Sequence, residues 1–405
     1  MKLKFFRKKI KKGIQDTFYI WNTELNTIFS DSAVMIFFFL VPLVYPLIYS
    51  FIYNQEVVRE APLAVVDDSH TSLSRDFVRR IDATPDVKVL GYYANMEEAK
   101  EMINTKKVYG ILHIPKAFSK DIHQGRQTSV ELFSDMSCLL YYKSFLLSST
   151  EVSLDMAKEI RVQLNLMSEE ASQQTMQEPI RYESLTMFNP QNGFAGFLVP
   201  SILILVIQQT LLLGICLLGG TMREHDKYGG LIPNNRRYHG IFRVVFGKSL
   251  AYVLVYIVVC FWTLIVVPAL FHLPQLASFG TMVVFLLPFL FSCIFLSMTL
   301  SGFMTSRESP MLVFVFTSVI LVFISGISWP MSAIPWFWKT VAYAIPSTPG
   351  IQGFVRINTM GATLHEVVLE YTILWIQTGV YFFTACAVYR RQLQLMYQHI
   401  KFCKN

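Results

Sequence analysis

The chain has 405 residues, of which 53% are hydrophobic and 16% charged, and its formal net charge at pH 7 is +7. Soluble domains usually carry about 25% charged residues, so this composition argues against a soluble protein. The apolar residues gather in long runs, and a bilayer core takes roughly 20 helical residues. We therefore predict six membrane spans, at residues 33–53, 194–218, 249–270, 279–303, 311–327 and 367–388.

The first 32 residues combine a basic segment, MKLKFFRKKIKK, with a stretch of helical periodicity. The periodic apolar positions are Ile14, Phe18, Trp21, Leu25 and Ile28. This pattern predicts an amphipathic helix over residues 14–31 that lies in the inner membrane interface. It serves either as a plain anchor or as a docking element for a partner, and the pattern does not decide between them.

The first apolar run is too long for the core of a signal peptide, and no small-residue cleavage site follows it. We therefore expect residues 33–53 to remain as an uncleaved anchor. Pro42 and Pro46 lie inside this run. We expect neighbouring helices to satisfy the backbone groups that the two prolines free.

Residues 54–193 predict a separate extracytoplasmic α/β domain. Strands are expected at 63–66, 87–93, 108–115 and 128–134, and helices at 72–81 and 95–104, the second capped by Asn95. A long helix should follow, because no Gly or Pro occurs between Arg126 and Glu178. Asp67 and Asp68, which end the first strand, are read as a strand-to-helix turn in preference to a metal or acid pair.

The distribution of Lys and Arg predicts the orientation. With the N-terminus in the cytoplasm, the predicted inner segments hold 18 basic residues, and the short outer segments 271–278 and 328–366 hold only Lys339 and Arg356. Cytoplasmic loops are richer in Lys and Arg, so both termini are expected to be cytoplasmic, with 389–405 as a tail. The charge is attributed to topology and contact with membrane lipid, and no nucleic-acid-binding module is found.

The motifs point to no catalytic, metal-binding or cofactor site. Gly247-Lys248-Ser249 ends like a phosphate-binding loop, but position 242 is Phe where that motif needs Gly, and a membrane span follows at once. We therefore expect no ATP binding by this chain. Inside the spans, Gln208, Gln209 and Gln377 are candidates to line a solute path, or equally to form hydrogen bonds between helices.

Three segments resemble the permeases of ABC-2-type exporters. The stretch REHDKYGGL resembles the motif after their second span through Arg223, Glu224, Gly229 and Leu231, although Gly230 replaces the usual Thr. Gly247-Lys248 resembles their Gly-Lys at the entry of the third span. The segment SGISWPMSAIPWFWKTVAYAIPSTPG resembles their apolar stretch between the last two spans, and the whole plan is similar to bacterial drug-efflux permeases with a large periplasmic domain after the first span.

This resemblance implies a fold, a function and partners. The fold would be an all-α bundle of six transmembrane helices with a re-entrant outer hairpin at 328–366, plus the α/β domain. The chain would be the permease subunit of an exporter in the bacterial inner membrane that moves an amphipathic or apolar compound such as a drug. Separate ATPase subunits would carry ATP and Mg and would dock on the loop 219–248 and the helix 14–31. A second permease, identical or paralogous, and a periplasmic adaptor with an outer-membrane channel are the other implied partners.

The resemblance also assigns the candidate site residues. The implied ATPase-coupling residues are Arg223, Glu224, Gly229, Leu231, Trp21 and Glu24. The implied outer gate comprises Trp329, Pro330, Pro335, Trp336 and Pro346, with a surface-lying amphipathic loop as the alternative.

Two other functions were weighed. A membrane-anchored sensor or scaffold with a periplasmic ligand-binding domain would need a cytoplasmic output domain, and the tail is too short for one. An ion-coupled transporter would need inverted repeats and several intramembrane carboxylates, for which Glu370 alone is poor support.

Overall fold

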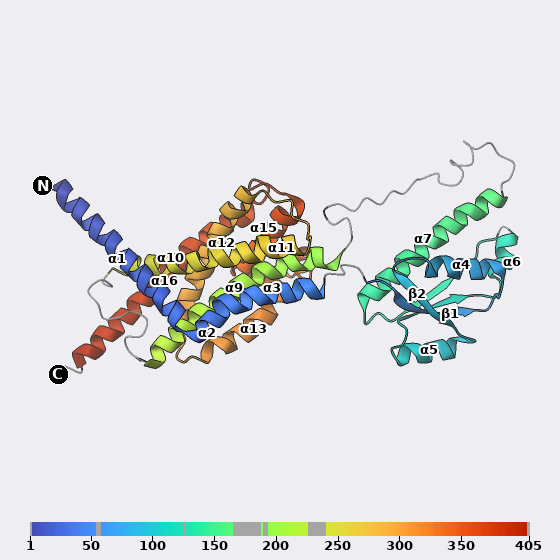
Figure 1. The fold of residues 1–405 in the computed structure, drawn as a ribbon, viewed down its shortest axis with the longest axis horizontal. Coiled ribbons are helices and arrows are strands. Elements are labelled where there is room, and N and C mark those ends of the chain that lie inside the picture. The colour runs from blue at the N-terminus through green and yellow to red at the C-terminus, as the bar shows by residue number, and fades with distance from the viewer. Residues whose placement is uncertain are drawn as a thin grey trace. The chain divides into compact units, whose positions relative to one another are not determined.

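The computed structural model describes residues 2–53, 58–124, 126–164, 188, 193–225 and 240–402. The chain forms two compact units, Gln55–Thr186 and the remainder, Met1–Asn54 with Met187–Asn405. We call them the sheet unit and the helical unit, and Figure 1 shows the elements of each.

The sheet unit contains one four-stranded sheet with the strand order β2-β1-β3-β4. The central strand β1 pairs in parallel with β2 and β3, and β4 runs antiparallel to β3. The strands are β1 Ala61–Asp67, β2 Val87–Tyr92, β3 Gly110–Ile114 and β4 Glu131–Ser134. The four predicted strands are confirmed. Parallel pairing follows from the helical crossovers between β1, β2 and β3.

Helices cover both faces of this sheet (Figure 1). They are α4 Ser72–Asp82, α5 Met96–Asn104, α6 Phe118–His123 and α7 Leu139–Leu164. Alternate residues of β1 face opposite ways, so Leu63 and Val65 pack with α4 and α7 while Ala64 and Val66 pack with α5. The predicted N-cap is confirmed, because the Asn95 side chain accepts a hydrogen bond from the Glu98 N–H at 2.8 Å.

The acidic end of β1 forms a turn. Oδ1 of Asp67 accepts the N–H groups of Ser69 and His70 at 3.0 and 3.2 Å, and its Oδ2 accepts the Ser74 hydroxyl at 2.7 Å. Among the described residues, no group of three or more His, Cys, Asp or Glu side chains could hold a metal ion. The hydrogen bonds from Ser69, His70 and Ser74 place Asp67 in a strand-to-helix turn, as predicted.

The predicted long helix after the sheet is present as α7, Leu139–Leu164. α7 has 26 residues, about 39 Å at 1.5 Å per residue, and the predicted helix continued past residue 164 into residues outside the described set. Phe145, Val152 and Met156 form its inward face and are buried against the sheet.

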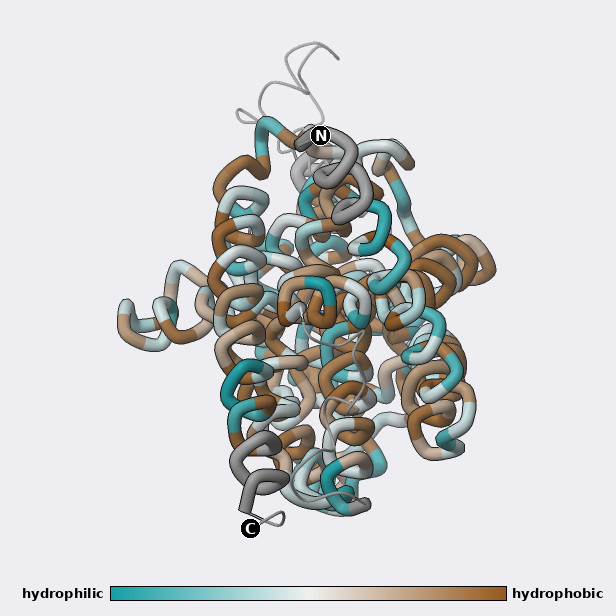
Figure 2. Tube along the Cα trace, turned by 90° about the vertical axis from the view of Figure 1, so that its left-hand side faces the viewer, coloured by the Kyte–Doolittle hydropathy of each residue, from teal (hydrophilic) through white to brown (hydrophobic). Residues whose placement is uncertain are grey.

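The helical unit is built from long apolar helices, and hydrophobic residues dominate them in Figure 2. Its longer elements are α1 Lys2–Ser30, α3 Val41–Ile52, α9 Phe194–His225, α10 Ile241–Phe261, α12 Phe279–Ser301, α13 Ser309–Ile324, α15 Ser347–Met360 and α16 Val368–Phe402. Shorter elements are α2 Ser32–Met35, the π-helices η1 Ile36–Leu40 and η3 Trp262–Val266, α11 Val267–Leu270, the 3₁₀ turn η4 Met331–Ala333 and α14 Trp336–Tyr343.

Five helical segments in the described part of the chain are long and apolar enough to cross a membrane. They are Ser32–Ile52, Phe194–Glu224, Ile241–Leu270, Phe279–Ser301 and Val368–Leu395. The remaining predicted span forms α13, whose 16 residues cover about 24 Å, short of a bilayer core of about 30 Å. The structure therefore supports five of the six predicted spans by length, and the sixth stays a prediction.

Pro46 of the first span is accommodated as predicted. Pro46 has no N–H, which frees the carbonyl of Pro42, and the Thr263 hydroxyl donates to that carbonyl at 3.3 Å. The Trp262 indole donates to the neighbouring Leu43 carbonyl at 3.1 Å. The first span and η3 are thus joined where proline interrupts the helical ladder.

Helix α9 is the centre of the helical unit. In its apolar window 94% of residues are buried, against 22% in Ser32–Ile52. Gly214 admits the ring of Phe38 from the first span, because a Cβ there would lie 1.9 Å from the ring. The other helices therefore pack around α9, most of whose apolar window is buried inside the helical unit.

Candidate functional site

The buried face of α1 differs from the predicted apolar stripe. Buried positions recur every four residues, at Asp16, Ile20, Glu24 and Ile28. Of the predicted stripe, Ile14 and Phe18 are about two-thirds exposed, at 65% and 64%. The helix is amphipathic as predicted, and the face that packs on α10 differs from the apolar stripe at Ile14 and Phe18 because both acidic residues have basic partners on α10.

Glu24 lies at the centre of a buried polar cluster. Nζ of Lys248 lies 2.9 Å from its carboxylate, and the two side chains are 3% and 5% exposed. Tyr252 donates its O–H to the other carboxylate oxygen. Lys248 also lies over the ring of Tyr389, with 6.0 Å between Nζ and the ring centroid. This cluster joins α1, α10 and α16.

Gly247 allows the two helices to approach this closely. A Cβ at this position would lie 3.0 Å from both the Thr17 carbonyl oxygen and a methyl carbon of Ile20. The neighbouring residue, Lys248, then reaches Glu24 across the short gap. The Gly-Lys pair that resembles a phosphate-binding loop is therefore part of the contact between α1 and α10.

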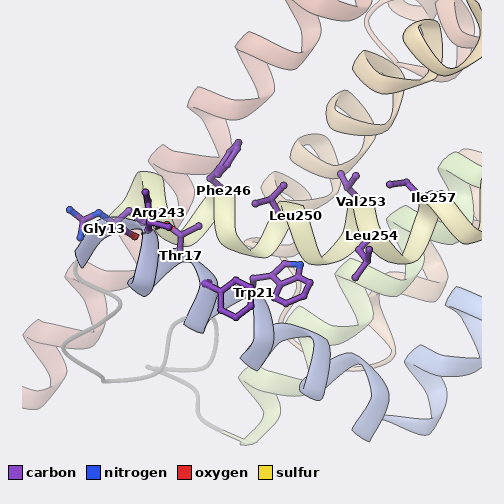
Figure 3. A pocket seen from close by; sticks show the side chains of 11 residues that line it. Gly13, Thr17, Trp21, Arg243, Phe246, Leu250, Val253, Leu254 and Ile257 are labelled. Atoms are coloured by element: carbon purple, nitrogen blue, oxygen red, sulfur yellow. Dashed lines mark hydrogen bonds between the residues drawn. The ribbon is translucent and has the colours of Figure 1, made fainter. Parts of the chain in front are cut away.

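A second ion pair lies nearer the start of both helices. Nη1 of Arg243 lies 3.1 Å from Oδ2 of Asp16, and the side chains are 38% and 11% exposed. Arg243 also stands at one end of a cavity of about 730 Å³ between α1 and α10. Figure 3 shows Phe246, Leu250 and Val253 following one another along α10, with Trp21 opposite them on α1.

The predicted coupling motif lies at the C-terminal end of α9. Arg223 donates hydrogen bonds to the carbonyls of Met304 and Gly302, so it ties α9 to the connection between α12 and α13. Glu224 is exposed at the end of the helix. Gly229 and Leu231 lie outside the described residues. Both predicted residues that are described belong to a helix, because α9 continues to His225, beyond the predicted span end at 218.

The other two predicted coupling residues lie on α1 in different surroundings. Trp21 is half-buried and lines the cavity between α1 and α10. Glu24 is held inside by Lys248 and Tyr252, as described above. A direct contact of Glu24 with a partner is therefore not available in this structure.

The three predicted path-lining glutamines are buried, and the structure does not bring them into one polar site. Nε2 of Gln377 donates to the Tyr343 carbonyl at 2.7 Å, which is the predicted alternative of an interhelical hydrogen bond. The Cys293 thiol lies 3.7 Å from Oε1 of Gln208. Nε2 of Gln208 and both amide atoms of Gln209 have no partner among the described residues.

The predicted outer gate contains two short helices, α14 with 8 residues and α15 with 14. Trp329, Pro330, Pro335 and Trp336 are exposed, whereas Pro346 is buried at the start of α15. At 1.5 Å per residue neither helix covers the bilayer core. The segment is therefore broken and apolar as predicted, and its entry into a bilayer stays a prediction.

The second helix of this segment is fixed to α16 by an ion pair. Nη1 of Arg356 lies 3.2 Å from Oε1 of Glu370, and its Nη2 donates to the Glu366 carbonyl at 2.7 Å. A glycine on α15 permits the same helix to pack closely on α12, since a Cβ on Gly353 would lie 2.3 Å from the ring of Phe285 in α12. Glu370 is thus occupied by Arg356, which weakens the case for an ion-coupled carboxylate.

Sequence reasoning missed the partners of α1. Lys248 was noticed only as part of a motif, and Asp16 and Arg243 were not singled out. The sequence signal for these partners was the four-residue spacing of Asp16, Ile20, Glu24 and Ile28. This spacing places two acidic residues and two isoleucines on one face of the helix. Such a face is explained when basic residues on another helix face it.

Two comparisons with known proteins point to the same class of protein, a membrane transporter. Residues 33–387 match the family model described as ABC-2 family transporter protein. A stretch of 111 residues is 31% identical to the linearmycin resistance permease protein LnrN of Bacillus subtilis (strain 168). That stretch covers 26% of this chain and 27% of the relative, so the chain spans about a quarter of the length of the relative it matches.

Proposed function

Because the chain belongs to the ABC-2 family of transporter proteins, we propose that it is the permease subunit of an ATP-driven exporter. Its cargo would be an amphipathic or apolar compound, such as a drug, moved out of the cytoplasm or inner membrane. The match to a resistance permease supports a cargo of this kind. The family match across most of the chain is the observation that carries the proposal, and it favours transport over a sensor or scaffold.

The proposed power source is a separate ABC ATPase that binds ATP and Mg and docks on α1 and the end of α9. The contacts described above support this arrangement. The Glu24–Lys248 cluster joins α1 to α10 and α16, and Arg223 joins α9 to the α12–α13 connection. A push on α1 or on the end of α9 would thus reach four other helices through polar contacts, as a two-state rearrangement requires.

A second permease, identical or paralogous, would complete the path. The side-chain amide of Gln209, which has no partner among the described residues, supports this reading, because a buried amide without a partner costs roughly 1–3 kcal/mol. A rearranged state or cargo could supply the missing hydrogen bonds. The exposed apolar face of α13 is available for a partner helix, since Leu312, Phe316 and Phe323 each have more than half of their surface exposed.

The remaining proposed partners and the location follow the family resemblance. We place the chain in the bacterial inner membrane with both termini in the cytoplasm and the sheet unit in the periplasm. There the sheet unit would meet an adaptor that leads to an outer-membrane channel. Leu139, Leu147 and Leu154 are exposed on α7 and offer such an adaptor an apolar surface.

Transport in inverted vesicles tests this function. Vesicles that contain the chain and its ATPase subunits are given ATP and a fluorescent amphipathic dye, and dye accumulation inside is followed. We expect ATP-dependent accumulation, which should fall in Arg223→Ala because α9 loses its tie to the α12–α13 connection. Accumulation that depends on an ion gradient and not on ATP would overturn the proposal.

A further inference from the structure

The cavity between α1 and α10 continues deeper along the same helix. The first cavity, of about 730 Å³, ends at Val253 and Ile257, and both residues also line a second cavity of about 450 Å³ between α10 and α12. Figure 3 shows the first part, from Arg243 at one end to Ile257 at the other. We call this first part the α10 groove.

The α10 groove has an apolar wall and one charged end. Arg243 is the single charged side chain among the described residues that line it. Most of the remaining lining is apolar, with Ile14, Phe18 and Trp21 on α1 and Phe246, Leu250 and Ile257 on α10. Such a surface suits a molecule with a long hydrocarbon tail and an anionic head.

The groove has the length of one bilayer leaflet. Arg243 and Ile257 are 14 residues apart on α10, which is about 21 Å. Half of a bilayer core is about 15 Å, and the headgroup layer adds several ångströms. A tail that begins beside Arg243 would therefore end near Ile257, at the depth of the membrane centre.

Charge around the mouth of the groove favours an anion. Asp16 contacts only Nη1 of Arg243, and 38% of that side chain remains exposed. Lys11 and Lys12 are exposed one turn earlier on α1 and follow the basic segment of the N-terminus. Asp16 and Arg243 together are neutral, so the excess positive charge at this end comes from Lys11 and Lys12.

We propose that the α10 groove is a binding site for one anionic phospholipid. Its phosphate contacts Arg243, and one acyl chain lies along α10 between Phe246 and Ile257. The bound lipid fills the space beside the Glu24–Lys248 contact and so braces α1 against α10. This inference requires only that α10 spans a membrane, so it stands or falls independently of the proposed export activity.

Native mass spectrometry of the full chain tests the proposal. The purified chain is exchanged into detergent containing equal amounts of phosphatidylglycerol and phosphatidylcholine, and retained lipids are counted. We expect the wild type to keep one phosphatidylglycerol. Arg243→Gln should reduce its retention about fivefold, the effect of one basic residue at an anionic surface. Arg307→Gln is the matched control, because Arg307 is also a half-exposed arginine paired with an aspartate, at 3.2 Å from Asp31.

A second measurement tests where the acyl chain of the lipid lies, and it does not depend on the arginine variants. Phosphatidylglycerol with brominated acyl chains should quench Trp21, which is read as the difference in fluorescence between the wild type and Trp21→Phe. Leu254→Phe, at an exposed wall position, should narrow the groove and weaken this quenching.

Three results would overturn the proposal. They are equal retention of phosphatidylcholine and phosphatidylglycerol by the wild type, equal loss in Arg243→Gln and Arg307→Gln, and absence of Trp21 quenching. A non-lipid molecule retained in the groove would overturn it as well.

Discussion

Glu24 and Lys248 show how a polar pair can be stable inside a helical membrane protein. Neither residue is left with a bare charge, because the carboxylate meets an ammonium and a tyrosine O–H while the ammonium also lies over an aromatic ring. Burying two charges is costly, and the pair repays this only when further contacts satisfy both groups. The cluster therefore specifies how α1 and α10 sit against each other more than it adds stability.

Removing one partner of this pair should be strongly destabilising. Glu24→Gln removes the carboxylate that lies 2.9 Å from the Lys248 ammonium, and removing one partner of a buried pair typically costs about 3–5 kcal/mol. We expect a large fall in the midpoint of thermal unfolding of the chain in detergent.

The Asp16–Arg243 pair provides the matched control for that experiment. Arg243 is partly exposed, so Asp16→Asn should cost about 1 kcal/mol or less. The double variant Glu24→Gln/Lys248→Met should recover part of the loss, because both charges of the buried pair are removed together. Equal effects of Glu24→Gln and Asp16→Asn would show that the buried pair is not special.

At the scale of elements, glycines set the spacing of α15 against α12. Gly353→Ala would place a methyl group 2.3 Å from the Phe285 ring, and overpacking of this kind typically costs about 1–3 kcal/mol. We expect a lower unfolding midpoint for this variant. In the control Gly379→Ala, nothing lies within 4 Å of the new methyl group, so helix propensity should leave the protein unchanged or more stable by about 0.5–1 kcal/mol. Equal loss in both variants would contradict the packing described for α15.

The outer segment around α14 makes a prediction about membrane topology. In a background without Cys138 and Cys403, Ser332→Cys should react with an impermeant maleimide in intact spheroplasts. Glu224→Cys, at the end of α9, should react only in inverted vesicles. Reaction of Ser332→Cys from the inverted side alone would mean that the segment crosses the membrane and is not re-entrant.

Most elements could be predicted from the sequence, because each depends on a local pattern. The strands of the sheet unit, the Asn95 cap and the long apolar helices are of this kind. The site could not be predicted to the same extent, since Glu24 and Tyr252 are 228 residues apart and nothing local indicates that they meet. Hydropathy indicated only the apolar stripe of α1 at Ile14 and Phe18, and it gave no sign that Asp16 and Glu24 face α10.

At the scale of the whole molecule, the polar contacts lie where helices from distant parts of the chain meet. Glu24 and Lys248 join α1 to α10 and α16, and Arg223 joins α9 to the α12–α13 connection. Helices bound in this way move as groups, so a partner that moves the end of α1 or α9 would also move the helices bound to it. This arrangement fits a permease whose energy comes from another subunit.

ATP hydrolysis in reconstituted vesicles tests this account most directly. The account predicts background hydrolysis by the chain alone and clear stimulation of the ATPase subunits by the wild-type chain. Stimulation should be lost in Glu224→Lys, whose exposed side chain at the end of α9 can change without unfolding the bundle. Hydrolysis by the chain alone, or full stimulation by Glu224→Lys, would contradict it.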